Sequence, residues 1–551
     1  MLDIDFSTKK ALIIESYKVF RDLIKNSTMK LGIGQVDCVR NSFDALSNCK
    51  DHDYDIIYLG YDLGEGKKNG QQTLEELRVN GLIKRTCTVI MITAESSQEM
   101  VLCAMEHKPD TYLTKPFTTK ELLRRLIQTM DKKAALSEIY LALDNANSEL
   151  VLTLCDAHLM QDTNYRQDCL KIKSQQLFKL GEFAATEEIC ERYTNDANCL
   201  WAAIGLGKVY MEYRLFDKAT HVFKKLLLEN PLYIPGYEWL AKNYKMQGDF
   251  ELSKSTLEKA IETSPRSVSL IQEYASVCEQ NTNYDNAITA YKKTLDLSKN
   301  SIHHTPKNGL NFARAMSDYS DLTDELDINK LTQQVFRELT NINRDFKNSE
   351  NKILTTLASA CLFFTNKDKH NATKALQESA NLCDLLEGDL PRYIALELAK
   401  AYMHFQIDEK AEPILLDLVE KHKNDDVFML KVDQFLQAPL SQQGKAETLT
   451  VIKIAVKHYN QKNYQDAVTE LSLILSRYPN HVSIKLNLIE ALLKSVQHDD
   501  FQNHLTRANQ LMVQLNKLPR KNEHFQRMLD LRKKLSAISV AKDSVSKDSV
   551  S

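Results

Sequence analysis

Four polar residues in the first part of the chain have types and spacings suited to phosphoryl chemistry. Glu15, Asp62 and Thr93 each follow an apolar run, and Lys115 precedes a proline. A carboxylate can accept a phosphoryl group or hold Mg²⁺ through oxygen, a hydroxyl can hold a phosphoryl oxygen, and a lysine can neutralise the added charge. These roles require that the four side chains meet, so the elements between them decide whether a site exists.

The segments before these residues are typical of strands buried on both faces of a parallel sheet. Apolar runs occupy residues 11–14, 56–59 and 88–92, and a fourth candidate strand lies at 110–114. Segments with helical spacing of apolar residues lie between them. This alternation predicts a doubly wound α/β domain with a five-stranded parallel sheet, whose ligands bind beyond the carboxyl ends of the strands. In the helical segment that contains Cys49, we expect Phe43 to share the buried face.

Residues 9–131 resemble the receiver domain of bacterial response regulators, because the landmarks of that domain fall in order on the expected elements. The landmarks are Leu12-Ile13-Ile14-Glu15, Arg21, Thr93-Ala94, Tyr112 and Lys115-Pro116-Phe117. The resemblance implies a phosphoacceptor aspartate, a Mg²⁺ ion on acidic residues, and a partner histidine kinase that donates the phosphoryl group. It also implies that Thr93, Lys115 and Tyr112 sense the phosphoryl group.

Two interpretations of the spacing place the phosphoacceptor at different residues. Counting forward from Asp55 in a D-x-x-x-x-D pattern leads to Gly60, which cannot be phosphorylated. Counting back from Gly70 leads to Asp62, and the intervals from Asp62 to the later threonine and lysine fit better. Residues 60 and 62 are expected to share one strand face. If Asp62 is the acceptor, Glu15 and Asp62 are the expected magnesium ligands.

The alternative is a receiver that keeps its fold and its docking face without accepting phosphate. Ser16 stands where receivers usually carry a second acid after the first strand. Glu15 and Asp62 would then present two carboxylates where receivers usually present three. Because Mg²⁺ keeps several waters, two protein carboxylates can hold it with weaker binding. Both alternatives stay open from the sequence.

The rest of the chain repeats a helix–turn–helix pattern at a period of 34 residues, the interval from Tyr210 to Tyr244. One register holds Tyr210, Ala219, Phe223 and Pro231, and shifting it by one and two periods recovers similar residue types. The pattern resembles tetratricopeptide repeats, which stack into a right-handed solenoid whose concave groove holds partner helices or peptides. Single aromatic residues such as Trp239 are interpreted as core between helices.

Six parts are expected along the chain. They are a receiver over residues 1–133, a helical linker over 134–165, tetratricopeptide repeats over 166–301, degenerate helical repeats over 302–390, C-terminal tetratricopeptide-like repeats over 391–540 and a disordered tail over 541–551. The linker is expected either to couple the receiver to the solenoid or to pack as the first cap of the stack.

Composition argues against several functional classes. The 551 residues carry a formal net charge of −3, without the basic excess of a nucleic-acid binder. No apolar run approaches the roughly 18 residues that a membrane span needs. The 11 cysteines are scattered singly, as expected for a cytoplasmic protein. No motif for catalysis occurs, so we expect no enzymatic activity.

A receiver followed by repeats resembles auxiliary response regulators of the VieB type, which modulate a phosphorelay by acting on its kinase. The resemblance implies a response regulator whose output is protein–protein interaction through the solenoid. The expected partner is a sensor histidine kinase or another signalling protein, held by residues 166–540 and modulated by the receiver. The rival hypothesis is a constitutive adaptor with a pseudo-receiver that cannot be phosphorylated.

Overall fold

The structure, a computed structural model, forms two compact units. It describes residues 5–64, 68–94, 109–161, 164–299, 301–320, 328–495, 501–516, 518 and 520–548. The first unit comprises residues 1–243, 255–271 and 293–305, and the second comprises residues 244–254, 272–292 and 306–551.

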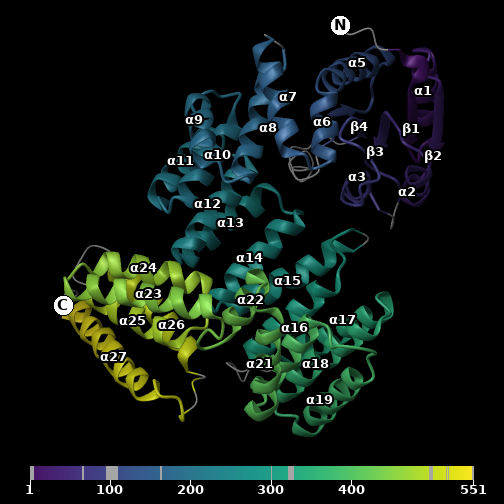
Figure 1. Cartoon of the computed structure of the whole chain (residues 1–551). Helices are drawn as coiled ribbons and strands as arrows, with labels where there is room; N and C mark the ends of the chain where they lie inside the picture. The colour runs from purple at the N-terminus through teal and green to yellow at the C-terminus, as the bar shows by residue number, and fades with distance from the viewer. Residues whose placement is uncertain are drawn as a thin grey trace. The chain divides into compact units, whose positions relative to one another are not determined.

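The first unit begins with a five-stranded parallel sheet in the order β2-β1-β3-β4-β5 (Figure 1). The strands are β1 Lys10–Ile14, β2 Gln35–Val39, β3 Ile56–Gly60, β4 Thr88–Thr93 and β5 Thr111–Thr114. The short η1 Phe6–Thr8 precedes the sheet, and its helices are α1 Lys18–Met29, α2 Ser42–Asp51, α3 Gly70–Val79 and α5 Thr119–Ala135. The predicted doubly wound, five-stranded domain is confirmed.

Two hydrophobic cores explain why the strands are apolar on both faces. Along β1, Leu12 belongs to the core with α2 and α3, whereas its neighbour Ile13 belongs to the core with α1 and α5. Successive side chains of a strand point to opposite faces, so a strand covered on both sides must be continuously apolar. Each fully buried side chain of this kind contributes roughly 1.5–3 kcal/mol.

Two details of this domain differ from the sequence-based prediction. Phe43 is 80% exposed, and Ala45 and Cys49 are buried instead. Asn41 caps α2 by accepting a hydrogen bond from the Asp44 amide, and Phe43, two residues before Ala45, lies on the opposite side of the helix. The edge strand β2 was not located from the sequence, because its partly exposed residues do not form an apolar run.

The linker is helical and contacts both its neighbours. It forms α6 Ser137–Asp144 and α7 Ser148–Met160, whose apolar residues share a core with Cys169 of α8. Asp144 forms an ion pair with Arg85 of the receiver at 3.1 Å, and the Lys133 ammonium of α5 lies 5.0 Å from the centre of the Tyr140 ring of α6. The linker therefore packs as a cap on the first repeat and also touches the receiver.

The rest of the chain is an all-α solenoid of helix pairs, as predicted. Its helices are α8 Arg166–Lys179, α9 Phe183–Tyr193, α10 Leu200–Glu212, α11 Phe216–Glu229, α12 Ile234–Gln247, α13 Phe250–Thr263, α14 Val268–Gln280, α15 Tyr284–Ser298, α16 Pro306–Ser320, α17 Ile328–Asp345, α18 Ser349–Thr365, α19 Lys369–Asp384, α20 Arg392–His404, α21 Asp408–His422, α22 Asp426–Phe435, α23 Gln442–Asn460, α24 Tyr464–Arg477, α25 Val482–Ser495, α26 Phe501–Leu515 and α27 Phe525–Asp548. The register residues Ala219 and Phe223 are fully buried, and a Cβ at Gly207 would meet the Phe223 ring. Close helix packing therefore explains the small residues of the register.

The turns inside the repeats share one backbone conformation. Gly181, Arg214, Gly248 and Thr282 all have positive φ, at intervals of 33, 34 and 34 residues. The left-handed conformation lets a short turn reverse the chain between paired helices, and glycine adopts it most easily. Lys367 has the same conformation between α18 and α19. The assignment of residues 302–390 to degenerate repeats stays a prediction.

The C-terminal helix is longer than expected. Residues 541–548, predicted to belong to a disordered tail, continue α27 as far as Asp548. The segment contains neither glycine nor proline, so no residue in it breaks the helix. Residues 549–551 lie outside the described part of the chain. Among the described residues, no helix combines the length and the apolar character that crossing a membrane requires.

Candidate functional site

The carboxyl ends of the parallel strands bring the predicted site residues to one edge of the sheet. Gly60 ends β3 opposite Ile92, and Thr93 ends β4 opposite Thr114. Glu15 directly follows β1, and Lys115 directly follows β5. The Lys115 amide donates to the Thr93 carbonyl at 2.7 Å, which fixes the start of the loop that carries the lysine.

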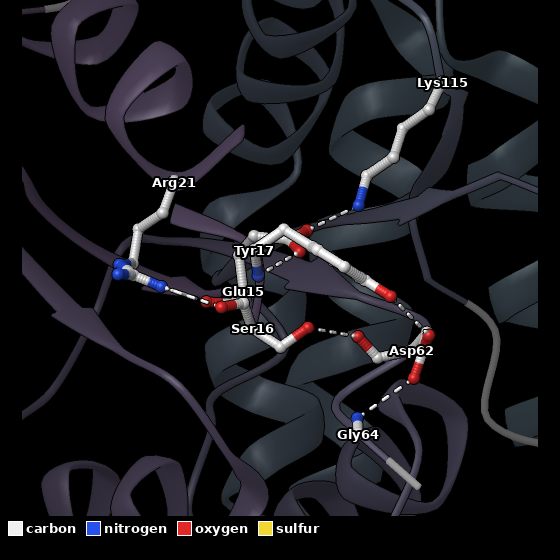
Figure 2. A network of polar contacts seen from close by, with 7 residues as sticks. All are labelled: Glu15, Ser16, Tyr17, Arg21, Asp62, Gly64 and Lys115. Carbon is white, nitrogen blue, oxygen red and sulfur yellow. Dashed lines mark hydrogen bonds and ion pairs between the residues drawn. The ribbon is translucent and has the colours of Figure 1, made fainter. Parts of the chain in front are cut away.

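A buried ion pair forms the centre of this edge (Figure 2). The Lys115 ammonium lies 2.9 Å from Glu15 Oε2, and the two side chains are 11% and 1% exposed. The Tyr17 amide donates to the other Glu15 oxygen at 3.1 Å. The same ammonium lies 4.3 Å from the centre of the Phe20 ring and 5.4 Å from that of Tyr17. The Lys115 ammonium is therefore stabilised within its own chain by one carboxylate and two aromatic rings.

Arg21 fixes the backbone that carries this carboxylate. Its guanidinium donates to the Glu15 carbonyl at 2.7 Å and to the Ser16 carbonyl at 3.2 Å. Arg21 lies in the first turns of α1 and is 8% exposed. The loop between β1 and α1 is therefore held by side-chain hydrogen bonds rather than by a second acid.

Gly60 occupies the end of β3, and the space beside it is filled. A Cβ at Gly60 would lie 2.8 Å from Glu15 Oε2 and 3.2 Å from the Ile14 carbonyl oxygen. Counting forward from Asp55 in the sequence thus leads to Gly60, the last residue of β3. Asp55 itself pairs with Lys9 at 3.0 Å, at the opposite end of β3. The strand β3 itself therefore ends without a carboxylate, and the nearest one beside Gly60 belongs to Glu15.

Asp62 lies beyond the strand, so residues 60 and 62 do not share a strand face as expected. The Asp62 side chain is exposed, and Oδ1 accepts a hydrogen bond from the Gly64 amide at 2.9 Å. The Tyr17 hydroxyl donates to Oδ2 at 3.4 Å, and the Ser16 hydroxyl donates to the Asp62 carbonyl at 3.0 Å. Figure 2 shows Asp62 on the Ser16 side of the network, with the Lys115 ammonium directed at Glu15.

The two remaining predicted residues lie on neighbouring strands. Thr93 is buried at the end of β4, and Tyr112 of β5 is half-buried against the core formed with α2 and α3. The segment that follows Thr93, residues 95–108, lies outside the described part of the chain. The structure thus gathers Glu15, Thr93 and Lys115 at one edge and leaves Tyr112 on the side of α2 and α3.

The donors at this edge do not fit a magnesium site as they stand. No group of three or more His, Cys, Asp or Glu side chains that could hold a metal occurs in the part of the chain that the structure describes. Glu15 is held by Lys115 and by an amide, and Asp62 accepts from Gly64 and Tyr17. A cation on Glu15 would have to displace the ammonium, so Glu15 and Asp62 as magnesium ligands stay a prediction.

Sequence reasoning missed the aromatic side chains that cover the lysine. Tyr17 and Phe20 follow Glu15 by two and five residues and contact Lys115 from the start of α1. Their position directly after the acid was visible in the sequence. Their contact with a lysine 95 residues beyond Phe20 follows only from the order of the strands.

Comparison with known proteins gives two family matches. Residues 11–127 match the response regulator receiver domain, and residues 234–267 match the tetratricopeptide repeat. The chain therefore carries a receiver domain followed by tetratricopeptide repeats. Receiver domains typically bind Mg²⁺ for phosphorylation. The receiver domain is typical of two-component signalling, and the tetratricopeptide repeats are typical of protein–protein interaction.

Individual proteins resemble one part each. Chemotaxis protein CheY-3 of Vibrio cholerae is 26% identical over 123 residues, which are 22% of this chain and 92% of CheY-3. The receiver domain of the Francisella response regulator 1452 is 25% identical, with a TM-score of 0.21, over 23% of this chain and 98% of that chain. The C-terminal part of a TPR repeat-containing protein from Cytophaga hutchinsonii is 15% identical, with a TM-score of 0.36, over 45% of this chain and 95% of that chain.

Proposed function

We propose that this chain is a non-enzymatic adaptor of two-component signalling, whose receiver acts without accepting phosphate and whose repeats bind a protein partner. The observation that carries the proposal is Gly60 at the end of β3, with the Glu15 carboxylate in the space that a side chain there would fill. A glycine offers no oxygen for phosphorylation. Of the two alternatives left open by the sequence, this observation favours the pseudo-receiver.

The charge balance of the edge supports the same proposal. In receivers the lysine neutralises the charge of the bound phosphoryl group. Here the Lys115 ammonium is already neutralised by Glu15 at 2.9 Å, with both side chains nearly buried. A phosphoryl group would have to compete with this internal carboxylate for the lysine. The Glu15–Lys115 pair therefore has to open before Lys115 can neutralise a phosphoryl group.

Phosphorylation at Asp62 is the second candidate, and the exposure of that carboxylate favours it. In this case a histidine kinase would donate the phosphoryl group, Glu15 and Asp62 would hold Mg²⁺, and Thr93 and Lys115 would hold the phosphoryl oxygens. Phosphorylation at Asp62 would break the Glu15–Lys115 ion pair, because the lysine cannot pair with Glu15 and with the phosphoryl group at the same time.

Labelling with acetyl phosphate and Mg²⁺, followed by intact-mass spectrometry, separates the two candidates. The proposed function predicts no phosphoryl adduct on the natural chain. A Ser16→Asp/Gly60→Asp variant supplies the two acids that receivers usually carry and is expected to be labelled. The substitution at Gly60 requires the Glu15 side chain to move away from residue 60 and the Ile14 carbonyl to shift by a few tenths of an ångström. An adduct on the natural chain that disappears in Asp62→Asn would establish the second candidate instead.

The proposed output is binding of a sensor histidine kinase or another signalling protein in the cytoplasm by residues 166–540. Stacked helix pairs of this kind offer an extended surface to partner helices or peptides. In a pull-down of candidate kinases, binding is expected to be equal with and without acetyl phosphate. A binding strength that changes with acetyl phosphate, and no longer does so in Asp62→Asn, contradicts a constitutive receiver.

A further inference from the structure

Two lysines stack on aromatic rings of α8, α10 and α12. These three helices are the first helices of three successive repeats (Figure 1). The Lys208 ammonium lies 4.1 Å from the centre of the Phe178 ring and 4.7 Å from that of Trp239. The Lys242 ammonium lies 4.5 Å from the same Trp239 ring. All four residues belong to the first unit. We call these four residues the lysine–aromatic strip.

The strip lies on the surface of the helices, not in their core. Its rings Phe178 and Trp239 are half-buried, and Lys242 is exposed. The core of the same helices is made by other residues, among them Leu206 and Leu240, which are 4% and 5% exposed. The interpretation of Trp239 as core is therefore incomplete, because this half-buried ring also contacts two ammonium groups.

No carboxylate neutralises the two lysines. Neither Lys208 nor Lys242 has an acidic group within ion-pair distance among the residues that the structure describes. Burial lowers the pKa of Lys208, and the positive charge of Lys242 lowers it further, whereas Glu212 acts in the opposite direction from beyond ion-pair distance. By contrast Lys245, one turn further along α12, is paired with Glu273 at 2.9 Å. The strip thus carries unbalanced positive charge.

An aromatic surface continues from the strip toward the turns of the first two repeats. The Phe183 ring lies 5.4 Å from Phe178, and the Tyr213 ring lies 6.2 Å from Phe183. Tyr213 is 41% exposed. A ligand that covers the strip therefore meets two cations at one end and apolar rings at the other.

We propose that the lysine–aromatic strip binds an acidic peptide segment of the protein partner, with carboxylates on Lys208 and Lys242 and an apolar side chain against Phe183 and Tyr213. This inference rests on the proposed function, in which the repeats bind protein. A carboxylate gains more beside a partly desolvated ammonium than in open solvent, and the rings hold both lysines in place. Nucleic acid is disfavoured, because such binders neutralise several phosphates and this chain has a net charge of −3.

Selection of peptides on the full-length chain tests this assignment without a known partner. A displayed library of random dodecapeptides is selected on the natural protein, and the acidic content of the recovered peptides is compared with the input. Binding of the recovered peptides is then measured by fluorescence polarisation on Lys208→Glu/Lys242→Glu. The control is Lys259→Glu, which makes a single charge reversal on the exposed side of α13. Circular dichroism confirms that each variant keeps its helices.

The expected result is enrichment of Asp and Glu next to apolar residues, with affinity at least about tenfold weaker on the double variant and unchanged on the control. Peptides without an acidic excess, peptides that bind the double variant equally well, or an absence of recovered peptides would overturn the assignment. The labelling of the receiver with acetyl phosphate is measured separately. If no acidic peptides are recovered and the natural receiver is not labelled, the result refutes the peptide site on the strip and leaves the proposed function standing. If the natural receiver is labelled, the result refutes the proposed adaptor without bearing on the strip.

Discussion

Replacing Lys115 by methionine should destabilise the receiver strongly, because it leaves the Glu15 carboxylate buried without a counter-charge. The Glu15 side chain is 1% exposed and would keep one hydrogen bond, from the Tyr17 amide. Removing one partner of a buried pair typically costs about 3–5 kcal/mol. Because Lys115 is 11% exposed and water can partly replace it, we expect about 3 kcal/mol. For a domain of this size that corresponds to a melting temperature lower by roughly 10 °C.

Hydrogen exchange of the full chain measures this loss where it occurs. Amides of β1 and β3 report the receiver, whereas tryptophan fluorescence reports only the repeats, since the two tryptophans are Trp201 and Trp239. Lys120→Met is the matched control, because Lys120 is an exposed lysine on α5. The control should leave the exchange of both strands unchanged, and the fluorescence transition should be unchanged in both variants.

A double variant separates the ion pair from simple packing. Glu15→Gln/Lys115→Met removes both charges, so it should recover part of the stability that Lys115→Met alone loses. A loss below about 1 kcal/mol in the single variant would refute the buried pair as the centre of the site. Equal losses in the single and double variants would show that the lysine acts only through its packing on Phe20.

Three further predictions concern backbone strain, buried charge and the loop after β1. Thr282 has a φ of 58°. Thr282→Gly should therefore raise the free energy of unfolding of the repeats by about 1 kcal/mol in urea. Lys293→Gly inside α15 is the control and should lower it by a similar amount. A lower free energy of unfolding in both variants would contradict strain at Thr282. Lys485 is 4% exposed, and burial lowers its pKa to about 8. The unfolded chain then binds the Lys485 proton more tightly than the native chain, so the free energy of unfolding should be lowest below about pH 8 and should rise toward pH 10.5. Lys485→Met should remove this rise. If the pH profile of unfolding is the same in this variant, the prediction is wrong. Arg21→Ala leaves the Glu15 and Ser16 carbonyls without their hydrogen bonds and should lower the stability of the receiver by about 1–3 kcal/mol, measured by hydrogen exchange of β1. No change within error would show that water replaces the guanidinium.

Local patterns in the sequence were sufficient for most of the fold. The apolar run Leu12-Ile13-Ile14 predicted a strand covered on both faces, and the pair Ala219 and Phe223 predicted close helix packing every 34 residues. Both depend on the periodicity of a single element, which the sequence shows directly. The edge strand β2 was missed because an exposed edge does not require an apolar run.

The arrangement of the site was less accessible, because it depends on contacts between distant elements. Spacing alone led to both Gly60 and Asp62, and a shift of two residues decides whether a carboxylate stands at the end of β3. The engagement of Lys115 by Glu15 joins residues 100 positions apart, and only the strand order brings them together. No local pattern showed that the Glu15 side chain fills the space beside Gly60.

The melting temperature of the receiver with beryllium fluoride and Mg²⁺, which together imitate a bound phosphoryl group, tests the central claim most directly. Calorimetry of the full chain should show no shift for the natural protein. It should show an upward shift for Ser16→Asp/Gly60→Asp, since a ligand at a hundredfold excess over its Kd adds about 2.7 kcal/mol to the stability of the state that binds it. A clear upward shift in the natural protein that Asp62→Asn abolishes would contradict the account, because the chain would then possess a working phosphoryl pocket at Asp62.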